Sequence, residues 1–226
     1  ANRTQTFPVT NAFSSNELQT GRNPRSTTTE DVDRDGIIDI LVTNVNSNDL
    51  SILKQETNGD FQELVNYTTG YYPTGIIATQ LNDDNQDGKS DENDFPDVVV
   101  ANTFSSGISI FNNLGGGVFA DEVQIATGYG PSGLVAGDFN NDGLSDVAVT
   151  QDYSNKVAIL LNDGNGLNKI TKQHIVQGAP VAILFTDVTN DGKGDIVTVN
   201  YDAHSISILA GLGNGDFSTA ISYPVG

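Results

Sequence analysis

The stretch Asp31-Val-Asp-Arg-Asp-Gly-Ile-Ile-Asp39 is the most informative part of the sequence, because an acidic motif of the same design occurs three more times, beginning at Asp83, Asp138 and Asp187. In the first copy, acidic side chains fall at positions 1, 3, 5 and 9 and a glycine at position 6. Ca²⁺ takes about six to eight oxygen ligands, and alternating carboxylates on a loop bent at a glycine supply them. The four loops therefore predict up to four calcium ions.

Each loop offers side-chain oxygens at alternating positions and a main-chain carbonyl at position 7. The predicted ligands of the first loop are Asp31, Asp33, Asp35, the Ile37 carbonyl and Asp39. Those of the second are Asp83, Asn85, Asp87, the Lys89 carbonyl, Asp91 and Asp94. Those of the third are Asp138, Asn140, Asp142, the Leu144 carbonyl and Asp146. Those of the fourth are Asp187, Thr189, Asp191, the Lys193 carbonyl and Asp195. Thr189 replaces a carboxylate or amide, so the fourth site is expected to be the weakest.

Asp and Asn also favour turns that bind no metal. Four copies that keep both the glycine and the ninth-position acid favour metal binding, because crowded carboxylates without a cation repel one another. The loops recur at the same place in every unit, so we expect the ions to be structural rather than catalytic.

The repeat has a measurable period. A proline precedes each loop at Pro24, Pro73, Pro131 and Pro180, with separations of 49, 58 and 49 residues. The unit is therefore 49 residues long, and the second contains nine extra residues between Gln80 and Asp97. Counting from Pro73 puts Gln80 at position 1 of that loop, whereas counting from Gly88 puts Asp83 there. The ligands predicted for the second loop are numbered by the count from Gly88.

Each unit contains four short runs of β-branched and apolar residues separated by Gly, Asn and Asp, which predicts four strands joined by tight turns. Four strands in about fifty residues are typical of a β-propeller blade. The sequence therefore predicts an all-β chain of four propeller-type blades. The expected segments are an N-terminal stretch at 1–20, assigned as the outer strand of a neighbouring blade, and blades at 21–70, 71–128, 129–178 and 179–226.

The composition of the chain limits the classes of partner that it can bind. The net charge of −19, from 29 acidic and 10 basic residues, argues against nucleic acid and anionic membrane surfaces as partners, since both need clustered Lys or Arg. The chain has no Cys, which excludes disulfides and zinc–thiolate sites, and no apolar run of membrane-spanning length.

The opening segments Gly70-Tyr-Tyr-Pro-Thr-Gly75 and Gly128-Tyr-Gly-Pro-Ser-Gly133, each followed by an acidic loop, resemble FG-GAP and VCBS repeats, the blades of integrin α-subunit heads and of many bacterial extracellular proteins. The resemblance covers about 21–226. It implies calcium loops between the first and second strands of each blade, an extracellular or cell-surface location, a role in adhesion, and rings that usually have seven blades. Only four units are present, which leaves a propeller fragment completed by further blades of the same parent chain, an open array completed by another copy, or an unusual four-bladed ring.

The function expected from these features is a non-enzymatic module that binds a protein or a glycan. No HExxH, GxSxG or Walker motif occurs, and His174 and His204 are expected on the solvated surface. Tyr71, Tyr72 and Tyr129 are expected to pack between blades, although exposed rings there could bind a sugar or a protein. Two alternatives remain: a structural subunit whose blades pair between chains in a homo-oligomer, and a scaffold domain of a polysaccharide-active enzyme.

Overall fold

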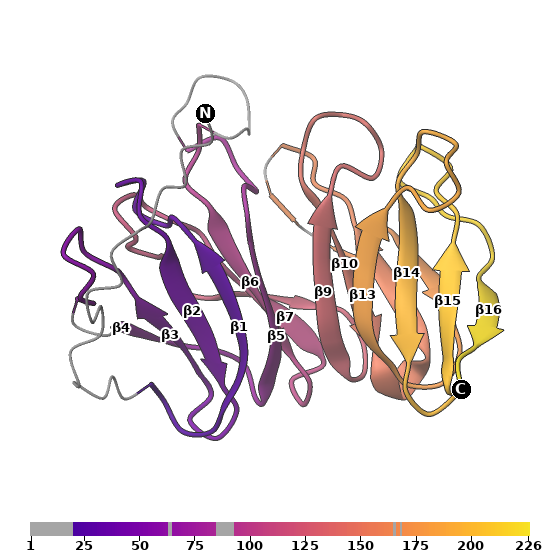
Figure 1. Ribbon diagram of the computed structural model, residues 1–226, viewed down its shortest axis with the longest axis horizontal. Coiled ribbons are helices and arrows are strands. Elements are labelled where there is room, and N and C mark those ends of the chain that lie inside the picture. The colour runs from indigo at the N-terminus through magenta and orange to yellow at the C-terminus, as the bar shows by residue number, and fades with distance from the viewer. Residues whose placement is uncertain (1–19, 63–64, 85–92, 165, 168) are drawn as a thin grey trace, which may run out of the picture.

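The computed structural model describes residues 20–62, 65–84, 93–164, 166–167 and 169–226, and these form four sheets of four antiparallel strands each (Figure 1). The first sheet contains β1 (Pro24–Glu30), β2 (Asp39–Asn44), β3 (Asp49–Leu53) and β4 (Val65–Thr68). The second contains β5 (Pro73–Thr79), β6 (Asp97–Asn102), β7 (Gly107–Phe111) and β8 (Val123–Ala126). The third contains β9 (Pro131–Gly137), β10 (Asp146–Gln151), β11 (Lys156–Leu160) and β12 (Lys172–Ile175), with a 3₁₀ turn η1 (Asp152–Ser154) after β10. The fourth contains β13 (Pro180–Thr186), β14 (Asp195–Asn200), β15 (Ser205–Leu209) and β16 (Ile221–Pro224).

Within every sheet the strands pair in chain order, so each sheet is one blade, and the predicted four-stranded repeat is confirmed. Strand composition follows the position in the blade. The second strands β6 and β10 are buried along their whole length, whereas the outermost strands β4 and β12 are mostly exposed. The segment assigned to a neighbouring blade, 1–20, lies outside the described residues except for Thr20.

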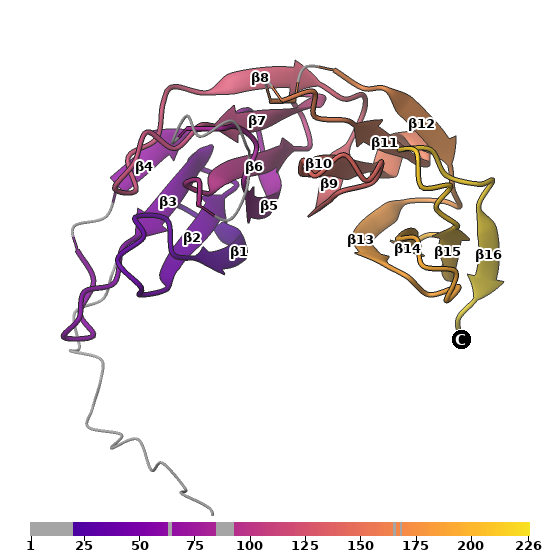
Figure 2. The same cartoon turned by 90° about the horizontal axis from the view of Figure 1, so that it is seen from above.

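The four blades form an open arc (Figure 2). The first strands β1, β5, β9 and β13 lie on the inside of the arc and contact one another in that order. The first and last sheets stand at opposite ends of the arc, so the described residues do not close into a four-bladed ring. That alternative is therefore wrong, and the open arc fits part of a larger propeller or an array that other blades complete.

Among the described residues the core consists of three apolar layers, each between two consecutive blades. The layer between the first and second blades joins Leu41, Leu50 and Ile52 to Ile76, Val98 and Val100. Equivalent layers join the second blade to the third and the third to the fourth. Because each blade buries its apolar face on its neighbour, burial between blades stabilises the arc as a whole.

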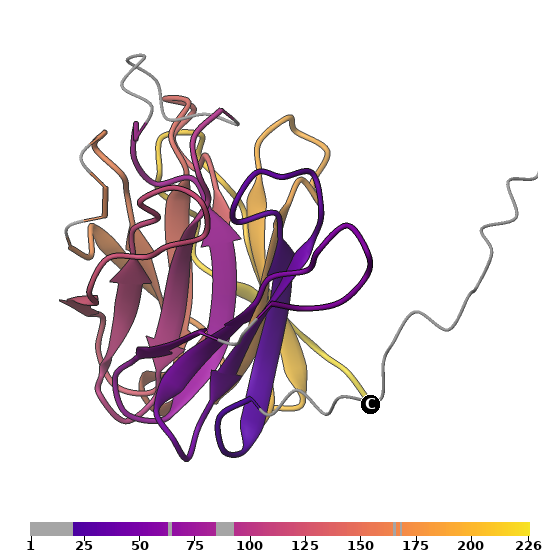
Figure 3. The same ribbon diagram turned by 90° about the vertical axis from the view of Figure 1, so that its left-hand side faces the viewer.

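The close contact of the second and third blades explains Gly75, the glycine that ends the opening segment of the second blade. A β-carbon on Gly75 in β5 would lie 2.0 Å from the carbonyl oxygen of Ser132 in β9. Only glycine allows the two inner strands to approach this closely. The acidic loops and the turns after the third strands lie at one end of the blades. The turns between the second and third strands lie at the other end (Figure 3).

Candidate calcium loops and the opposite aromatic face

Each acidic loop joins the first and second strands of its blade, at the upper end in Figure 1. In three loops the first aspartate organises the turn by accepting backbone N–H groups. Asp31 accepts from Asp35 at 3.1 Å and from Gly36 at 2.8 Å. The same pair of bonds forms at Asp138, from Asp142 and Gly143, and at Asp187, from Asp191 and Gly192.

The fifth position continues this pattern. Asp35 Oδ1 accepts the N–H of Ile37 at 2.8 Å, and Asp142 and Asp191 accept those of Leu144 and Lys193 at 2.9 Å. The intervening glycine at position 6 has a φ of 84 to 88° in all three loops, a conformation that favours glycine. The three loops therefore share one backbone shape, which fits the identical spacing of their acids.

The ninth-position aspartate is a buried link between two loops of one blade. Asp39 Oδ2 accepts the N–H of Val32 at 3.1 Å, and Oδ1 accepts that of Gln55, which follows β3, at 2.9 Å. All four blades repeat this arrangement, through Asp39, Asp97, Asp146 and Asp195. Each of these carboxylates fixes the acidic loop to the turn beyond the third strand. Asp39, Asp146 and Asp195 therefore have a structural role besides their predicted ligation, and Asp97, which was not among the predicted ligands, has the same structural role.

The environment shifts the pKa of these buried acids. Burial raises the pKa of Asp97 to about 7 and that of Asp146 to about 6, against the lowering effect of their backbone hydrogen bonds. The pKa of Asp39 is raised for the same reason. At Asp195 burial is the largest single influence, but the N–H groups of Gly211, Thr189 and Val188 together outweigh it and lower the pKa.

The first loop brings three predicted ligands together. Carboxylate oxygens of Asp31, Asp33 and Asp39 lie within 4.8 Å of one another. Asp33 Oδ1 is buried and has no hydrogen-bond partner, while Asp33 Oδ2 lies 3.4 Å from Lys54 Nζ. A buried carboxylate oxygen without a donor is costly, and a hard divalent cation compensates it. These residues therefore fit a calcium ion, whereas Asp35 lies outside the group of three.

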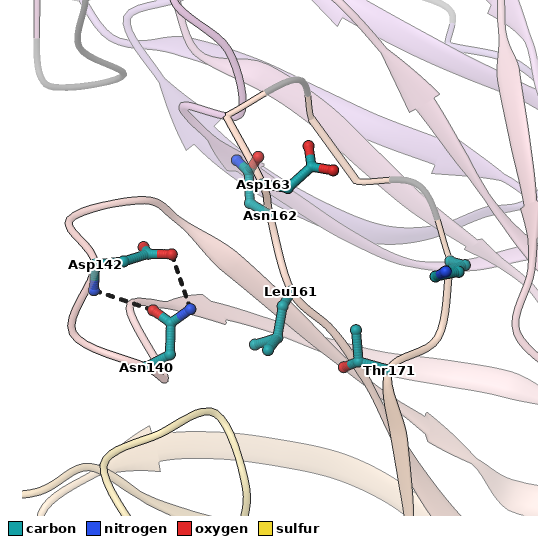
Figure 4. A pocket seen from close by; sticks show the side chains of 7 residues that line it. Asn140, Asp142, Leu161, Asn162, Asp163 and Thr171 are labelled. Carbon is teal, nitrogen blue, oxygen red and sulfur yellow. Dashed lines mark hydrogen bonds between the residues drawn. The ribbon is translucent and has the colours of Figure 1, made fainter.

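The third and fourth loops hold their acids less tightly: within the part of the chain that the structure describes, no other three acids approach as closely. Position 3 is occupied there by Asn140 and Thr189. Asn140 donates to Asp142 Oδ2 at 2.8 Å and accepts the Asp142 N–H at 3.0 Å, beside a hollow of about 350 Å³ (Figure 4). The Asn140 side chain is thus hydrogen-bonded to both the side chain and the backbone of Asp142, and the calcium ligation of these residues stays a prediction.

The expanded second loop keeps the repeat register at both of its ends. Asp97 accepts the N–H of Leu81 at 3.1 Å, as Asp39 accepts that of Val32. Gln80 therefore occupies the position of Asp31, as counting from Pro73 predicts. The predicted ligands Asn85, Asp87, Lys89 and Asp91 lie outside the described residues, and the register that begins at Asp83 stays a prediction.

Two further acids of this loop lie close together. Asp84 accepts the N–H of Phe95 at 3.2 Å, and the predicted ligand Asp94 is buried. The pKa of Asp84 is raised, mainly by burial and further by Asp94. Arg34 of the first loop donates to the Asn93 carbonyl and lies 5.7 Å from the centre of the Phe95 ring, so the first two loops are in contact.

The opposite end of the blades carries exposed aromatic rings, which were expected to pack between blades. Tyr71 is 61% exposed and Tyr129 67% exposed, so the packing expectation is wrong for both. They belong to a ring cluster completed by Tyr72, Phe104 and Tyr153. Phe104 and Tyr153 were missed, because nothing in their local sequence distinguishes an exposed turn ring from a packed one.

Comparisons with known structures agree on the architecture. A lectin from Agrocybe aegerita is 17% identical with a TM-score of 0.61, over 88% of this chain and 52% of the lectin. A functionally unknown protein from Desulfotomaculum acetoxidans is 14% identical with a TM-score of 0.65, over 95% of this chain and 62% of that one. The periplasmic gluconolactonase of Pseudomonas aeruginosa is 15% identical with a TM-score of 0.62, over 90% of this chain and 54% of that one. The chain thus spans between half and two thirds of the length of these similar proteins.

No curated protein matches the sequence. The described residues contain no helix suited to crossing a bilayer. The family model of the FG-GAP-like repeat matches residues 85–149 and 138–198, which together make up half of the chain. These matches run through the second, third and fourth acidic loops and the strands that follow them. The chain belongs to the FG-GAP-like repeat family.

Proposed function

We propose that this chain is a calcium-stabilised, non-enzymatic binding module of an extracellular or cell-surface protein, which recognises a protein or a glycan in adhesion. The observation that carries the calcium part is the buried, unpartnered Oδ1 of Asp33 beside Asp31 and Asp39. An ion bound there would neutralise three acids that otherwise repel one another.

The ion would act on stability through Asp39. This carboxylate already joins the acidic loop to Gln55, so an ion on the loop would reinforce the contact between that loop and the turn after the third strand. A ligand that binds only the folded state stabilises it by about 2.7 kcal/mol at a concentration 100 times its Kd.

Calorimetric unfolding in EDTA and again after calcium is restored tests this role. We expect a lower melting temperature in EDTA and full recovery with Ca²⁺, but not with the same concentration of Na⁺. Identical transitions in EDTA and in calcium would refute the proposal.

An extracellular location accords with the expected strength of the sites. Calcium sites of extracellular modules bind with dissociation constants of roughly 10⁻⁴ to 10⁻³ M, which suits loops whose third position is Asn140 or Thr189. Such sites fill only where calcium is abundant, as it is outside cells.

A pocket lined in part by Tyr72, Asp152 and Tyr153 lies beside the ring cluster, and its lining favours a binding role without catalysis. Asp152 is the one acid among its lining residues, and no histidine lines it. Hydrolysis of a glycoside normally needs two carboxyl groups, and general acid–base chemistry needs a paired proton donor and acceptor. The similar lectin is described as recognising terminal N-acetylglucosamine, which supports carbohydrate as one ligand class for this architecture.

A second candidate function, a subunit of an assembly in which blades pair between copies, is favoured by the free face of the fourth sheet. Leu184, Val197, Ile208 and Ile221 lie opposite one another across its four strands. Leu184 is 64% and Ile221 60% exposed, whereas Ala148 and Ile159, the equivalents of Val197 and Ile208 in the third sheet, are fully buried against the fourth. No described residue provides such a cover for the last sheet.

Light scattering over a range of concentrations tests the assembly. We expect association that Leu184→Lys weakens and that Ile175→Lys, on the exposed outer strand β12, leaves unchanged. A monomer at every concentration would exclude this candidate.

A further inference from the structure

We propose that the ring cluster of Tyr71, Tyr72, Phe104, Tyr129 and Tyr153, with the pocket beside it, is a binding site for a neutral glycan. The inference rests on the proposed role as a binding module and adds its location and ligand class. The site lies at the end of the blades opposite the calcium loops.

The repeat allows equivalent turns with and without aromatic residues to be compared, which separates a functional from a folding role of the rings. In the second blade the N–H of Phe104 donates to the Tyr71 carbonyl at 3.2 Å, and in the first blade the N–H of Asn46 donates to the Arg22 carbonyl at 3.1 Å. The two turns are therefore equivalent, yet only one carries rings. Tyr129 and Tyr153 hold the same two positions in the third blade, and Gly178 and Asp202 hold them in the fourth. The turn folds without aromatic residues, so their presence in the two middle blades requires another reason.

The rings form a continuous row across the boundary between these blades. Ring centres are 6.2 Å apart for Tyr71 and Phe104, 6.5 Å for Phe104 and Tyr153, and 6.0 Å for Tyr153 and Tyr129. The planes of Phe104 and Tyr153 differ by only 5°. All four residues are more than half exposed. A row of exposed rings is an unfavourable surface unless a ligand covers it.

Tyr72 adds backbone strain at the same place. Its φ is 62°, a left-handed conformation in which the equivalent residues of the other blades are Asn23, Gly130 and Ala179. A bulky side chain in this region costs about 1 kcal/mol or more. The Tyr72 ring lies 4.7 Å from that of Phe104 and lines the pocket, so a large ring is kept where a small residue would be less strained.

The pocket, of about 190 Å³, receives residues from all four blades. Its threonine and serine hydroxyl groups are already occupied: Thr74 contacts Thr103, Thr103 donates to the Pro131 carbonyl, and Ser132 contacts Thr150 and the Pro180 carbonyl. Two charged groups also line the pocket. Asp152 Oδ1 is buried without a hydrogen-bond partner, and Arg25 makes no hydrogen bond or ion pair with the described residues.

The charged groups of the pocket and the exposed rings beside it indicate the chemical class of the ligand. The unpartnered carboxylate oxygen of Asp152 needs a hydrogen-bond donor, and the Arg25 guanidinium in the same lining offers donors to an acceptor, so a ligand that carries both kinds of group suits the pocket. Because one negative and one positive group face the pocket, a neutral ligand is favoured over a charged one. The rings need an apolar face to cover them. A pyranose combines hydroxyl groups on its edge with C–H groups on its faces, and a pocket smaller than the usual 300 Å³ or so for drug-sized ligands fits a single sugar unit. Further units of an oligosaccharide would then lie along the ring row.

A screen of the calcium-loaded chain against an array of neutral and acidic glycans, followed by calorimetric titration of the neutral glycans bound, tests the site. We expect Tyr153→Ala to weaken binding at least tenfold and Asp152→Asn to weaken it several-fold, with unchanged melting temperatures. Tyr223→Ala, which removes an exposed ring from the outer strand β16, is the matched control and should bind as the wild type does.

The inference is overturned if no neutral glycan binds, or if binding survives Tyr153→Ala and Asp152→Asn together. It is also overturned if an arginine-rich peptide binds instead and Asp152→Asn abolishes that binding, because the site would then recognise a cation. An EDTA-sensitive melting transition without glycan binding would refute this inference alone and leave the calcium-stabilised module standing.

Discussion

The side-chain amide of Asn113 donates a 2.8 Å hydrogen bond to the carbonyl oxygen of Val32, which lies in the acidic loop of the preceding blade. Asn162 makes the same bond to Leu81, again one blade back and with the same length. Since Val32 and Leu81 are the residues whose N–H groups bind Asp39 and Asp97, the first and second acidic loops are each held from both sides. These two acidic loops are thus connected to the following blades as well as to their own.

Asn113→Ala should destabilise the fold by about 2 kcal/mol or more. The substitution removes the bonds to the Val32 and Pro96 carbonyls and leaves buried acceptors without a donor. Chemical unfolding in urea measures the change. Asn112→Ala is the control, because its side chain makes no hydrogen bond to the described residues, and equal stability of the two variants would contradict the inferred role of Asn113.

Asp33→Asn should have opposite effects with and without calcium. In EDTA the variant should be at least as stable as the wild type, since it removes a buried charge near Asp31 and Asp39. In calcium it should be less stable, since it weakens the ion's ligand set. Melting temperatures in both buffers test the crossover, with Asp60→Asn, an exposed acid of the same blade, as control. A variant that loses stability equally in both buffers would show that Asp33 acts only through packing.

Metal-free protein should lose stability as the pH rises from about 4 to about 7. The pKa of Asp97 is raised by burial from 3.8 to about 7, so the folded state holds a proton there that the unfolded state has released. The stabilisation is complete below the unfolded pKa and is lost as the pH passes the folded one. Asp146, with a pKa of about 6, contributes in the same direction.

Urea midpoints in EDTA at pH 5 and pH 7.5 measure this effect, and Asp97→Asn should flatten the difference. Calcium should oppose the trend, because its carboxylate ligands must be ionised. A midpoint in EDTA that increases between these pH values would contradict the account.

Gly75→Ala should destabilise the contact between the second and third blades by about 2 kcal/mol or more. The new β-carbon would lie 2.0 Å from the Ser132 carbonyl oxygen, a clash with backbone that neither strand can easily relieve. Gly178→Ala is the matched control from another opening segment, where the nearest atom lies 3.6 Å away. Thermal unfolding compares the two, and equal melting temperatures would contradict the close approach of β5 and β9.

The fold could be predicted from the sequence because its signals repeat. Pro24 and its equivalents mark the start of each first strand, and Asp39 and its equivalents mark the start of each second strand. The dual role of Asp39 was not predicted, since spacing identifies an acid in the loop but not the backbone groups that meet it. The retention of Asp97 across the insertion was the available signal that this residue has a structural role.

Side-chain exposure could not be predicted in the same way. His174 was expected on the solvated surface, yet its Nε2 lies 3.3 Å from Asp216 and its ring packs edge-on against Phe217 of the next blade. Burial is the main influence that lowers its pKa. Conversely, Tyr71 and Tyr129 were expected between blades and lie exposed. Both errors concern contacts between consecutive repeats, which the pattern within one repeat does not encode.

Asp31, Asp33 and Asp39 are the residues we propose to hold a calcium ion in the first loop. A crystal structure determined in calcium, with anomalous diffraction to identify the ion, tests this proposal most directly. We expect an anomalous peak with oxygen atoms of Asp31, Asp33 and Asp39 at about 2.3 to 2.6 Å, and with Asp33 Oδ1 among the ligands. A first loop without an anomalous peak in calcium-saturated crystals, with Asp33 Oδ1 hydrogen-bonded to water instead, would contradict it.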